Sequence, residues 1–362
     1  MAAAAIAASP CRLQLSGLDS VAACETIEAA NRSGRPVAQD RRWPCPLRCT
    51  PLAWGAMPTL SIAAAPAMAR PSLRLASNTP GPFYVDRSCI DCGTCWQWDP
   101  QHFGPGGAQA HVHTQPAGES ATRQALLALQ ACPVAAIGAP AELRAITPAD
   151  GFPALLCEGD FGRVHYCGWA SRRSFGASSY LIVRPAGNVL IDSPRWSAPL
   201  ARRIAALGGL AAIVLSHRDD VADHDRWAAA FGCPRWIHAA DANAAPRAER
   251  RLQGEAPLEL DPDLRLIPTP GHTAGSLVAL LGGRVLFSGD HLWWSDRLGA
   301  VVASRDYCWW DWPSQLRSVA ILRDLDVRWL FPGHGGRRRF AAGDWRQQLD
   351  QLLATSRTPG QP

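Results

Sequence analysis

The chain of 362 residues contains no lysine, so arginine supplies all 36 of its basic side chains. Because alanine is also abundant, we attribute this bias to coding composition rather than to chemistry. The formal net charge is +5, but residues 1–75 hold eight arginines and four acidic residues, a net +4, which leaves +1 for the remainder. The sequence therefore has no basic patch that would indicate a nucleic-acid partner.

Long apolar runs are missing as well. No stretch offers the roughly 18 uninterrupted apolar residues that a membrane helix needs, so we expect no membrane partner. The hydrophobic content of 47% and the charged content of 19% are typical of a globular protein. The length has room for about two domains.

The first 75 residues are rich in Ala, Ser, Pro and Arg and show no sustained helix or strand period. The opening MAAAAIAAS is too short to cross a bilayer and lacks the charged flank of a secretory signal. We interpret residues 1–75 as a transit peptide, which predicts localisation in the chloroplast, with the mitochondrion as the alternative organelle. A disordered tail is the other interpretation.

A group of closely spaced cysteines follows this segment. Cys89, Cys92 and Cys95 form a C-x2-C-x2-C pattern, which lets three thiolates converge on one face of an iron–sulfur cluster. Cys132, which precedes a proline, would supply the fourth ligand. Asp99 stands where two-cluster ferredoxins carry a cysteine for their other cluster, so one cluster is expected. These residues predict a single [4Fe-4S] cluster.

Structural zinc is the main alternative for the same cysteines. Zinc ribbons usually present two separated C-x2-C pairs, whereas here three cysteines are clustered and the fourth is remote. The segment RQALLALQACP reads as a short amphipathic helix that delivers Cys132 to the cluster. The pattern resembles single-cluster bacterial-type ferredoxin domains. This resemblance implies a small N-terminal ferredoxin-like α+β domain over residues 78–145.

Strands and helices alternate from about residue 155 onward. SSYLIVRP and GNVLIDSP read as a β-hairpin, and APLARRIAALGG reads as a helix. LAAIVLSH is a short apolar strand that ends at His217, and DHDRWAAAFG is helical again. The residues between them form a loop at the C-terminal end of a strand, where α/β folds usually place chemistry.

Three later segments end a predicted strand with a candidate ligand beside glycine. LIPTPGHTAGSL contains His272, RVLFSGDHLWW contains Asp290, and VRWLFPGHGG contains His334. Glycine permits tight turns and a close approach of the backbone to a metal. Four such turns in one chain predict a metal site assembled from strand ends.

The order of these turns resembles the metallo-β-lactamase superfamily over roughly residues 155–345. The resemblance implies an α/β (α+β) fold, a four-layer αβ/βα sandwich in residues 152–350, followed by a tail at 351–362. Asp192 matches the early aspartate that braces the site. Asp223 and Asp290 are the implied catalytic residues, which orient a water and bridge two ions. The metal ligands implied by position are His217, Asp223, His224, His272, Asp290 and His334.

The loop after His217 departs from the superfamily. Asp219 occupies the position of the second histidine, and two additional residues precede Asp223 and His224. Either Asp219 is a carboxylate ligand, or the first metal is held by His217 and His272 with water. A carboxylate in place of an imidazole makes a site harder and shifts its preference from zinc toward iron or manganese. We expect one or two divalent ions, zinc or iron, with a vestigial site that holds no metal as the alternative.

The leading functional interpretation is a metal-dependent hydrolase that acts on an ester or thioester and carries an iron–sulfur cluster. The alternatives are an oxidoreductase whose non-haem iron site is fed by the ferredoxin domain, and a redox or iron sensor with a vestigial site. Expected partners are a small-molecule substrate and, in the redox interpretation, an electron donor or acceptor protein. Core packing would explain some of the tryptophans near the expected site, and a substrate wall or a domain contact would explain the rest: Trp293, Trp294, Trp309, Trp310 and Trp312.

Overall fold

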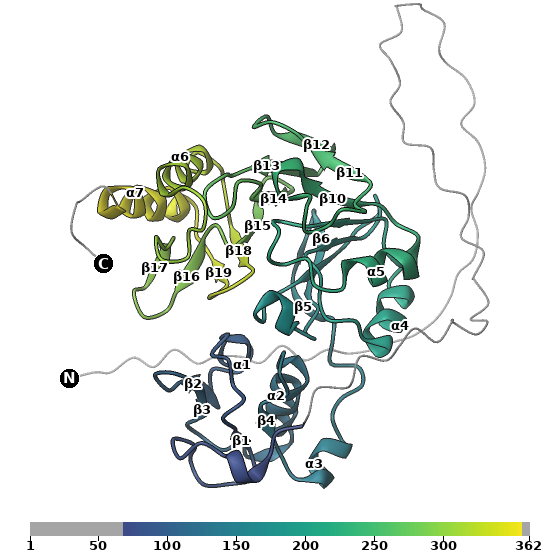
Figure 1. The fold of residues 1–362 in the computed structure, drawn as a ribbon, viewed down its shortest axis with the longest axis vertical. Helices are drawn as coiled ribbons and strands as arrows, with labels where there is room; N and C mark the ends of the chain where they lie inside the picture. The colour runs from purple at the N-terminus through teal and green to yellow at the C-terminus, as the bar shows by residue number, and fades with distance from the viewer. Residues whose placement is uncertain (1–67, 357–362) are drawn as a thin grey trace, which may run out of the picture. The chain divides into compact units, whose positions relative to one another are not determined.

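The structure is a computed structural model that describes residues 68–356 (Figure 1). The predicted transit peptide falls almost wholly on residues 1–67 and so lies outside the described residues. Residues 71–75, which the prediction included, are folded: Pro71–Leu73 forms a 3-10 helix, η1, and Leu75 packs against the core of the first domain. Residues 71–75 therefore belong to that domain.

The first domain holds the four clustered cysteines between short elements. Two antiparallel strand pairs and three helices build it: β1 (Tyr84–Val85) with β4 (Ile137–Gly138), β2 (Phe103–Pro105) with β3 (Ala110–Val112), α1 (Thr94–Trp98), α2 (Gly118–Ala131) and α3 (Ala141–Ala145). Helix α2 buries Ala125, Leu126 and Ala128 in the core of this domain. The helix ends at Ala131, and its C-cap Cys132 has non-helical backbone because proline, here Pro133, disfavours helical backbone in the residue that precedes it. The predicted helix that delivers Cys132 is confirmed.

A seven-stranded sheet opens the second domain. Its strands follow one another in space in chain order: β5 (Ala154–Gly159), β6 (Gly162–Tyr166), β7 (Tyr180–Val183), β8 (Val189–Ile191), β9 (Ala212–Val214), β10 (Arg235–His238) and β11 (Arg250–Leu252). Neighbours from β5 to β8 are antiparallel, and neighbours from β8 to β11 are parallel. The predicted hairpin is β7–β8, and the predicted buried strand is β9, whose three residues are all buried.

A six-stranded sheet faces the first. Its order is β12 (Leu258–Asp261), β13 (Leu264–Pro268), β14 (Leu277–Leu281), β15 (Val285–Gly289), β18 (Trp329–Pro332) and β19 (Arg338–Arg339). Strand β14 is buried on both faces: Leu277 and Leu281 join the core between the sheets, while Val278 and Leu280 join a second core. The hairpin β16 (Trp293–Ser295) and β17 (Ala300–Val302) lies beyond β15 in the chain.

Helices cover the outer faces of both sheets, which makes four layers (Figure 1). Buried side chains of α4 (Ala198–Ala206) and α5 (His224–Phe231) extend the core of the first sheet. Those of α6 (Trp312–Leu322) and α7 (Asp344–Ser356) fill the second core. Two 3-10 turns, η2 (Arg172–Ser174) and η3 (Ala239–Asp241), lie in the loops. The αβ/βα sandwich implied by the resemblance is confirmed.

The C-terminal boundary differs from the expectation. A tail was expected from residue 351, but α7 continues to Ser356, and Leu352 and Leu353 are buried in the second core. The domain therefore extends to the end of α7, because both leucines belong to the same buried cluster as residues of α6 and of the second sheet. Among the described residues, no helix combines the length and the apolarity needed to span a bilayer.

Candidate metal centre and cluster site

The four cysteines of the first domain meet around one cavity, which Ile90 and Pro133 help to line. Cys89 and Cys92 lie in irregular backbone, Cys95 lies in the first turn of α1, and Cys132 follows α2. Burial, with the nearby Cys92 thiol second, raises the pKa of Cys132 to about 11. Burial also raises the pKa of Cys95 well above its usual value. Such thiols become thiolate ligands only when cations compensate their charge, so these residues fit an iron–sulfur cluster.

The spread of the sulfurs disfavours a single zinc ion. Four thiolates at about 2.3 Å from one zinc would lie about 3.8 Å from one another. Among residues 68–356, no three cysteine sulfurs form a group within 4.8 Å of one another. A larger polynuclear group suits this spacing better than one ion does.

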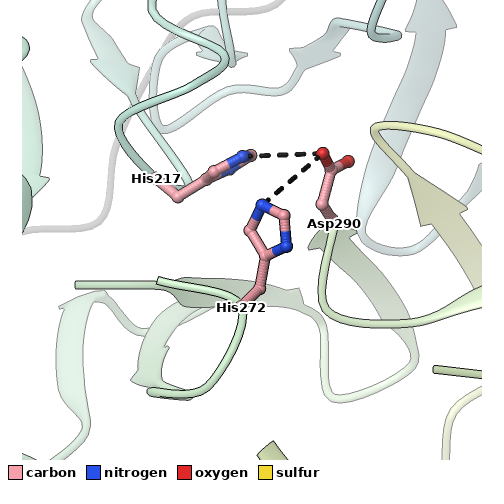
Figure 2. A group of neighbouring side chains, drawn as sticks. All are labelled: His217, His272 and Asp290. Atoms are coloured by element: carbon pink, nitrogen blue, oxygen red, sulfur yellow. Dashed lines mark ion pairs between the residues drawn. The ribbon is translucent and has the colours of Figure 1, made fainter. Parts of the chain in front are cut away.

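The second domain brings candidate ligands together where strand ends of both sheets meet. His217 follows β9 of the first sheet, whereas His272, Asp290 and His334 follow β13, β15 and β18 of the second. His217, His272 and Asp290 form a first group of possible ligands (Figure 2). Oδ2 of Asp290 lies 3.6 Å from Nε2 of His217 and 3.8 Å from Nε2 of His272.

Asp220, Asp290 and His334 form a second group of possible ligands. Nδ1 of His334 lies 2.9 Å from Oδ1 of Asp290, so Asp290 belongs to both groups. Glycine is required beside them: a Cβ on Gly333 would lie 2.6 Å from Oδ1 of Asp290 and 2.7 Å from Oδ2 of Asp220. The sequence analysis predicted this role for the glycines beside the ligands, namely to let the backbone approach the site closely.

Asp219 lies next to the first group, which is the position it needs if it is a carboxylate ligand. Its Oδ2 is 3.4 Å from Nε2 of His272 and 3.8 Å from Nε2 of His217. The side chain is 44% exposed, so it can approach an ion from the solvent side.

Buried donor atoms without partners test whether these residues fit a metal. Nε2 of His217, Nε2 of His272 and both carboxylate oxygens of Asp220 are buried and make no hydrogen bond. Buried polar atoms are normally paired, because an unpaired one loses its hydration without compensation. Atoms of this kind that face one another fit divalent cations.

The other nitrogen of each histidine is held in place. Nδ1 of His217 bonds to Ser216 Oγ (2.9 Å), Nδ1 of His272 to the carbonyl of Tyr307 (2.6 Å), and Nε2 of His334 to the carbonyl of Phe175 (3.4 Å). Metal-binding histidines usually donate their second ring N–H in this way, which orients the ring. The arrangement leaves one nitrogen of each ring facing the carboxylates.

Asp192 braces the site as the resemblance implied. Its carboxylate accepts hydrogen bonds from the amide of Ser216 (2.7 Å) and from the hydroxyl of the same residue (2.9 Å), and that hydroxyl contacts His217. Burial raises the pKa of Asp192 to about 6. The residue thereby holds the end of β9 against β8.

Charges within the site compensate one another. Burial by itself lowers the pKa of His217, but the carboxylates of Asp220 and Asp290 raise it to about 10. Burial and the charge of Asp290 raise the pKa of Asp220 well above its usual range. Burial opposes ionisation of Asp290 as well, yet His334 and His217 bring its pKa well below the usual range. The negative charge concentrated here would be compensated by divalent cations.

Asp223 and His224, which the resemblance implied as ligands, lie outside the two groups of possible ligands. Asp223 precedes α5 and accepts a hydrogen bond from the amide of Trp196 (2.8 Å), while His224 starts the helix and its Nδ1 contacts Arg235 (3.3 Å). Neither belongs to the two ligand groups. The two additional residues, Val221 and Ala222, lead the chain away from the site, so Asp220 rather than Asp223 lies in the second group of possible ligands.

Asp241 is a positioning residue that the sequence did not reveal. It is fully buried, and its carboxylate accepts hydrogen bonds from the amide of Arg218 (3.0 Å), the hydroxyl of Thr273 (2.5 Å) and the amide of Gly275 (3.1 Å). Asp241 therefore ties the loop after His217 to the loop that carries His272. No pattern in the surrounding RWIHAADA predicts this role.

The tryptophans divide between the core and the surface. Trp294 is buried in the second core, whereas Trp309 and Trp310 are 57% and 53% exposed. The ring of Trp309 lies 6.1 Å from that of His272. Part of this group of tryptophans is thus exposed beside the site, as the substrate-wall interpretation requires. His291, next to Asp290, is buried, and neither of its ring nitrogens has a partner.

Comparisons with known proteins agree with this architecture. Residues 85–139 match the family model described as the 4Fe-4S single cluster domain of Ferredoxin I, and residues 172–334 match that of the Metallo-beta-lactamase superfamily. The chain therefore joins a single-cluster 4Fe-4S domain to a domain that belongs to the metallo-β-lactamase superfamily. Both resemblances in the sequence are confirmed.

Two curated relatives cover part of the chain. The hydroxyacylglutathione hydrolase of Acidiphilium cryptum is 31% identical over 32% of this chain and 48% of its own length. That of Anaeromyxobacter dehalogenans is 35% identical over 34% of this chain and 50% of its own length. The chain thus spans about half the length of these relatives. A solved metallo-beta-lactamase superfamily protein of Sulfolobus tokodaii is 17% identical, with a TM-score of 0.40, over 57% of this chain and 89% of that one.

Proposed function

We propose that this protein is a metal-dependent hydrolase that cleaves an ester or, preferentially, a thioester. The observation that carries the proposal is the set of buried donor atoms without partners on His217, His272 and Asp220, which face Asp290. The preference for thioesters rests on the two relatives, which are named hydroxyacylglutathione hydrolases, because an acylglutathione is a thioester.

Each residue of the site has a chemical task in this reaction. Divalent ions held here would supply a Lewis acid and a water whose pKa is lowered to about 7. Asp290 faces both ligand groups, which supports a bridging role. Asp220, whose two oxygens have no hydrogen-bond partner, would orient the attacking water, the task that the sequence had suggested for Asp223. The three histidines, each held through its second nitrogen, need little rearrangement during the reaction.

Exposed aromatic rings beside the site suggest an apolar substrate group. Tyr307 and Trp309 are 61% and 57% exposed and lie with ring centroids 6.3 Å apart. The carbonyl of Tyr307 holds His272, and the amide of Trp309 donates to the carbonyl of His272. An acyl or thiol portion with apolar surface would pack on these rings.

The test compares Asp220→Asn with Asp223→Asn in protein purified anaerobically with its cluster. We expect Asp220→Asn to lower kcat for acyl thioesters on the order of 10³-fold, because the water loses its orienting carboxylate and an ion loses a ligand. Asp223→Asn should keep kcat within about threefold of the wild-type value, since its carboxylate binds Trp196 and Arg173 instead. Kinetics on thioesters and on matched oxygen esters, with metal analysis, measure both.

Absence of metal-dependent cleavage for every thioester and ester tested would overturn the proposal. The reverse ranking, with Asp223→Asn inactive and Asp220→Asn active, would instead overturn the assignment of Asp220. His272→Ala serves as the positive control for loss of the centre, because its Nε2 belongs to the first group.

A second candidate is an oxidoreductase with iron at the centre. The observation that favours it is Asp219, whose carboxylate lies where an imidazole was expected and therefore favours a harder ion. In that case the purified centre should contain iron, and a Cys132→Ser variant should lose turnover while keeping the centre loaded. Zinc in the centre and a rate indifferent to cluster reduction would exclude this candidate.

A further inference from the structure

We propose that Phe175 and Gly176 couple the two sites, so that a loaded cluster positions His334 and raises the affinity of the centre for its metal. Both residues belong to the segment that follows η2 and precedes β7. The inference rests on the metal centre of the proposed function, but not on the bond that this centre cleaves.

The cluster side of the coupling is a contact with Cys92. Thr94 Oγ1 lies 3.2 Å from the sulfur of Cys92 and donates a hydrogen bond to the carbonyl of Gly176 (2.9 Å). Gly176 has a φ of +90°, and a Cβ there would lie 2.6 Å from Cβ and 2.7 Å from Sγ of Cys92. The backbone of Gly176 therefore lies directly against a cluster ligand, where any larger residue would collide with it.

The metal side of the coupling is a contact with His334. The carbonyl of Phe175 accepts the hydrogen bond from Nε2 of His334, which leaves Nδ1 facing Asp290 at 2.9 Å. The next residues hold the same loop, since the amide of Ser178 donates to the carbonyl of Gly333 (2.7 Å). A carbonyl that binds the second nitrogen of a histidine ligand orients the ring and changes its affinity for metal. Phe175 is thus a positioning residue for His334.

Binding of the cluster would determine the position of Cys92, and through it the position of Gly176 and Phe175. Residues 87–93, which include Cys92, form no helix or strand, so bonds to iron would be the main restraint on the Cys92 side chain. Without iron, no metal bond would hold the four sulfurs around one point. The position of Gly176, and with it the carbonyl of Phe175, would then be less well defined.

A second contact between the domains runs in parallel. Trp98, at the end of α1, stacks on Tyr166 with ring centroids 5.7 Å apart. The guanidinium of Arg337, three residues after His334, lies 4.2 Å from the centre of the Tyr166 ring. The loop that carries His334 therefore reaches the cluster domain by two routes. One runs through Phe175 and Gly176, and the other runs through Tyr166.

Thermodynamic linkage makes the coupling measurable with zinc, which carries no electrons between the sites. The experiment measures zinc affinity of the full chain by chelator competition, with the cluster intact, in Thr94→Val and Gly176→Ala. Both variants should bind zinc at the centre at least fivefold more weakly than wild type, within the usual range for coupled sites. Iron content and the visible spectrum of the cluster should stay those of wild type in Thr94→Val, because valine has nearly the shape of threonine. In Gly176→Ala, whose added Cβ would lie 2.7 Å from the sulfur of Cys92, zinc affinity is compared only at equal iron content.

Two variants serve as matched controls. Thr147→Val removes a hydroxyl that also donates to a backbone carbonyl, that of Arg144 (2.8 Å), and Gly107→Ala changes a glycine of φ +92° with no atom near its Cβ position. Neither residue contacts Cys92 or His334, so both variants should keep the zinc affinity of wild type.

A cluster-free chain, with all four cluster cysteines replaced by serine, completes the design. It should bind zinc as weakly as Thr94→Val, and adding Thr94→Val to it should cause no further loss, because the coupling is already broken. Equal zinc affinity with and without the cluster overturns the inference, as does an equal loss from Thr94→Val in both backgrounds. Absence of zinc binding in the loaded wild type would overturn the metal centre itself, and so the proposed function too.

Discussion

Two neighbouring aspartates, Asp219 and Asp220, make the candidate ligand set of this metal centre rich in oxygen. Asp219 faces the first ligand group from the solvent side, whereas Asp220 is buried in the second. Consecutive residues of an irregular loop point in different directions, so each carboxylate can serve a different ion. The centre consequently holds three histidines and three carboxylates, an oxygen-rich set that suits iron better than an all-imidazole site does.

Asp219→Asn and Asp219→His test whether the carboxylate of Asp219 sets the preference of the centre for iron over zinc. The histidine variant restores the residue usual in the superfamily and should shift the ratio of bound zinc to bound iron toward zinc by on the order of tenfold. Metal analysis after anaerobic loading with equimolar Zn²⁺ and Fe²⁺ measures the ratio. An unchanged ratio in both variants would mean that Asp219 only lines the loop.

At the scale of elements, helix positions decide which residues reach the centre. Helix α5 begins at His224, and its first turn directs that histidine to Arg235 instead of the metal site. Packing also sets the end of helix α7, whose last turn buries Leu352 and Leu353 in the second core.

A chain that stops after residue 350 should be less stable than one that stops after residue 356. Loss of Leu352 and Leu353 exposes apolar surface of the second core, and each buried leucine contributes about 1.5–3 kcal/mol. We expect the midpoint of thermal unfolding to fall by about 5 °C or more in the shorter chain. Calorimetry of both chains gives the comparison; equal midpoints would show that the last turn of α7 does not stabilise the domain.

At the scale of the whole molecule, the cluster domain and the metallo-β-lactamase domain, within residues 68–356, belong to one compact unit. Trp98 packs on Phe152 and Tyr166, and the amide of Ala170 donates to the carbonyl of Ala131 (3.1 Å). Such contacts give the cluster domain a physical connection to the domain that holds the candidate metal centre.

The N-terminal segment yields a prediction at the same scale. If residues 1–67 are part of a transit peptide, protein from its native organelle should begin between about residues 55 and 70. A later start would remove η1, which belongs to the first domain. N-terminal sequencing decides this, and a mature protein that begins at Met1 or Ala2 would contradict the prediction.

The sequence alone determined which cysteines meet at the candidate cluster site and most of the residues that meet at the candidate metal centre. Cys89, Cys92 and Cys95 are close in the chain, and the residues that follow β9, β13, β15 and β18 carry glycine or strand-end patterns that do not depend on distant contacts. Only the tertiary structure decided that Asp220 reaches the centre and Asp223 does not. The turn at Ala222, with a φ of +33°, and the bond from Trp196 to Asp223 set that loop, and neither leaves a local pattern. The contact of Gly176 with Cys92 likewise joins residues of two domains, so it exists only once both have folded.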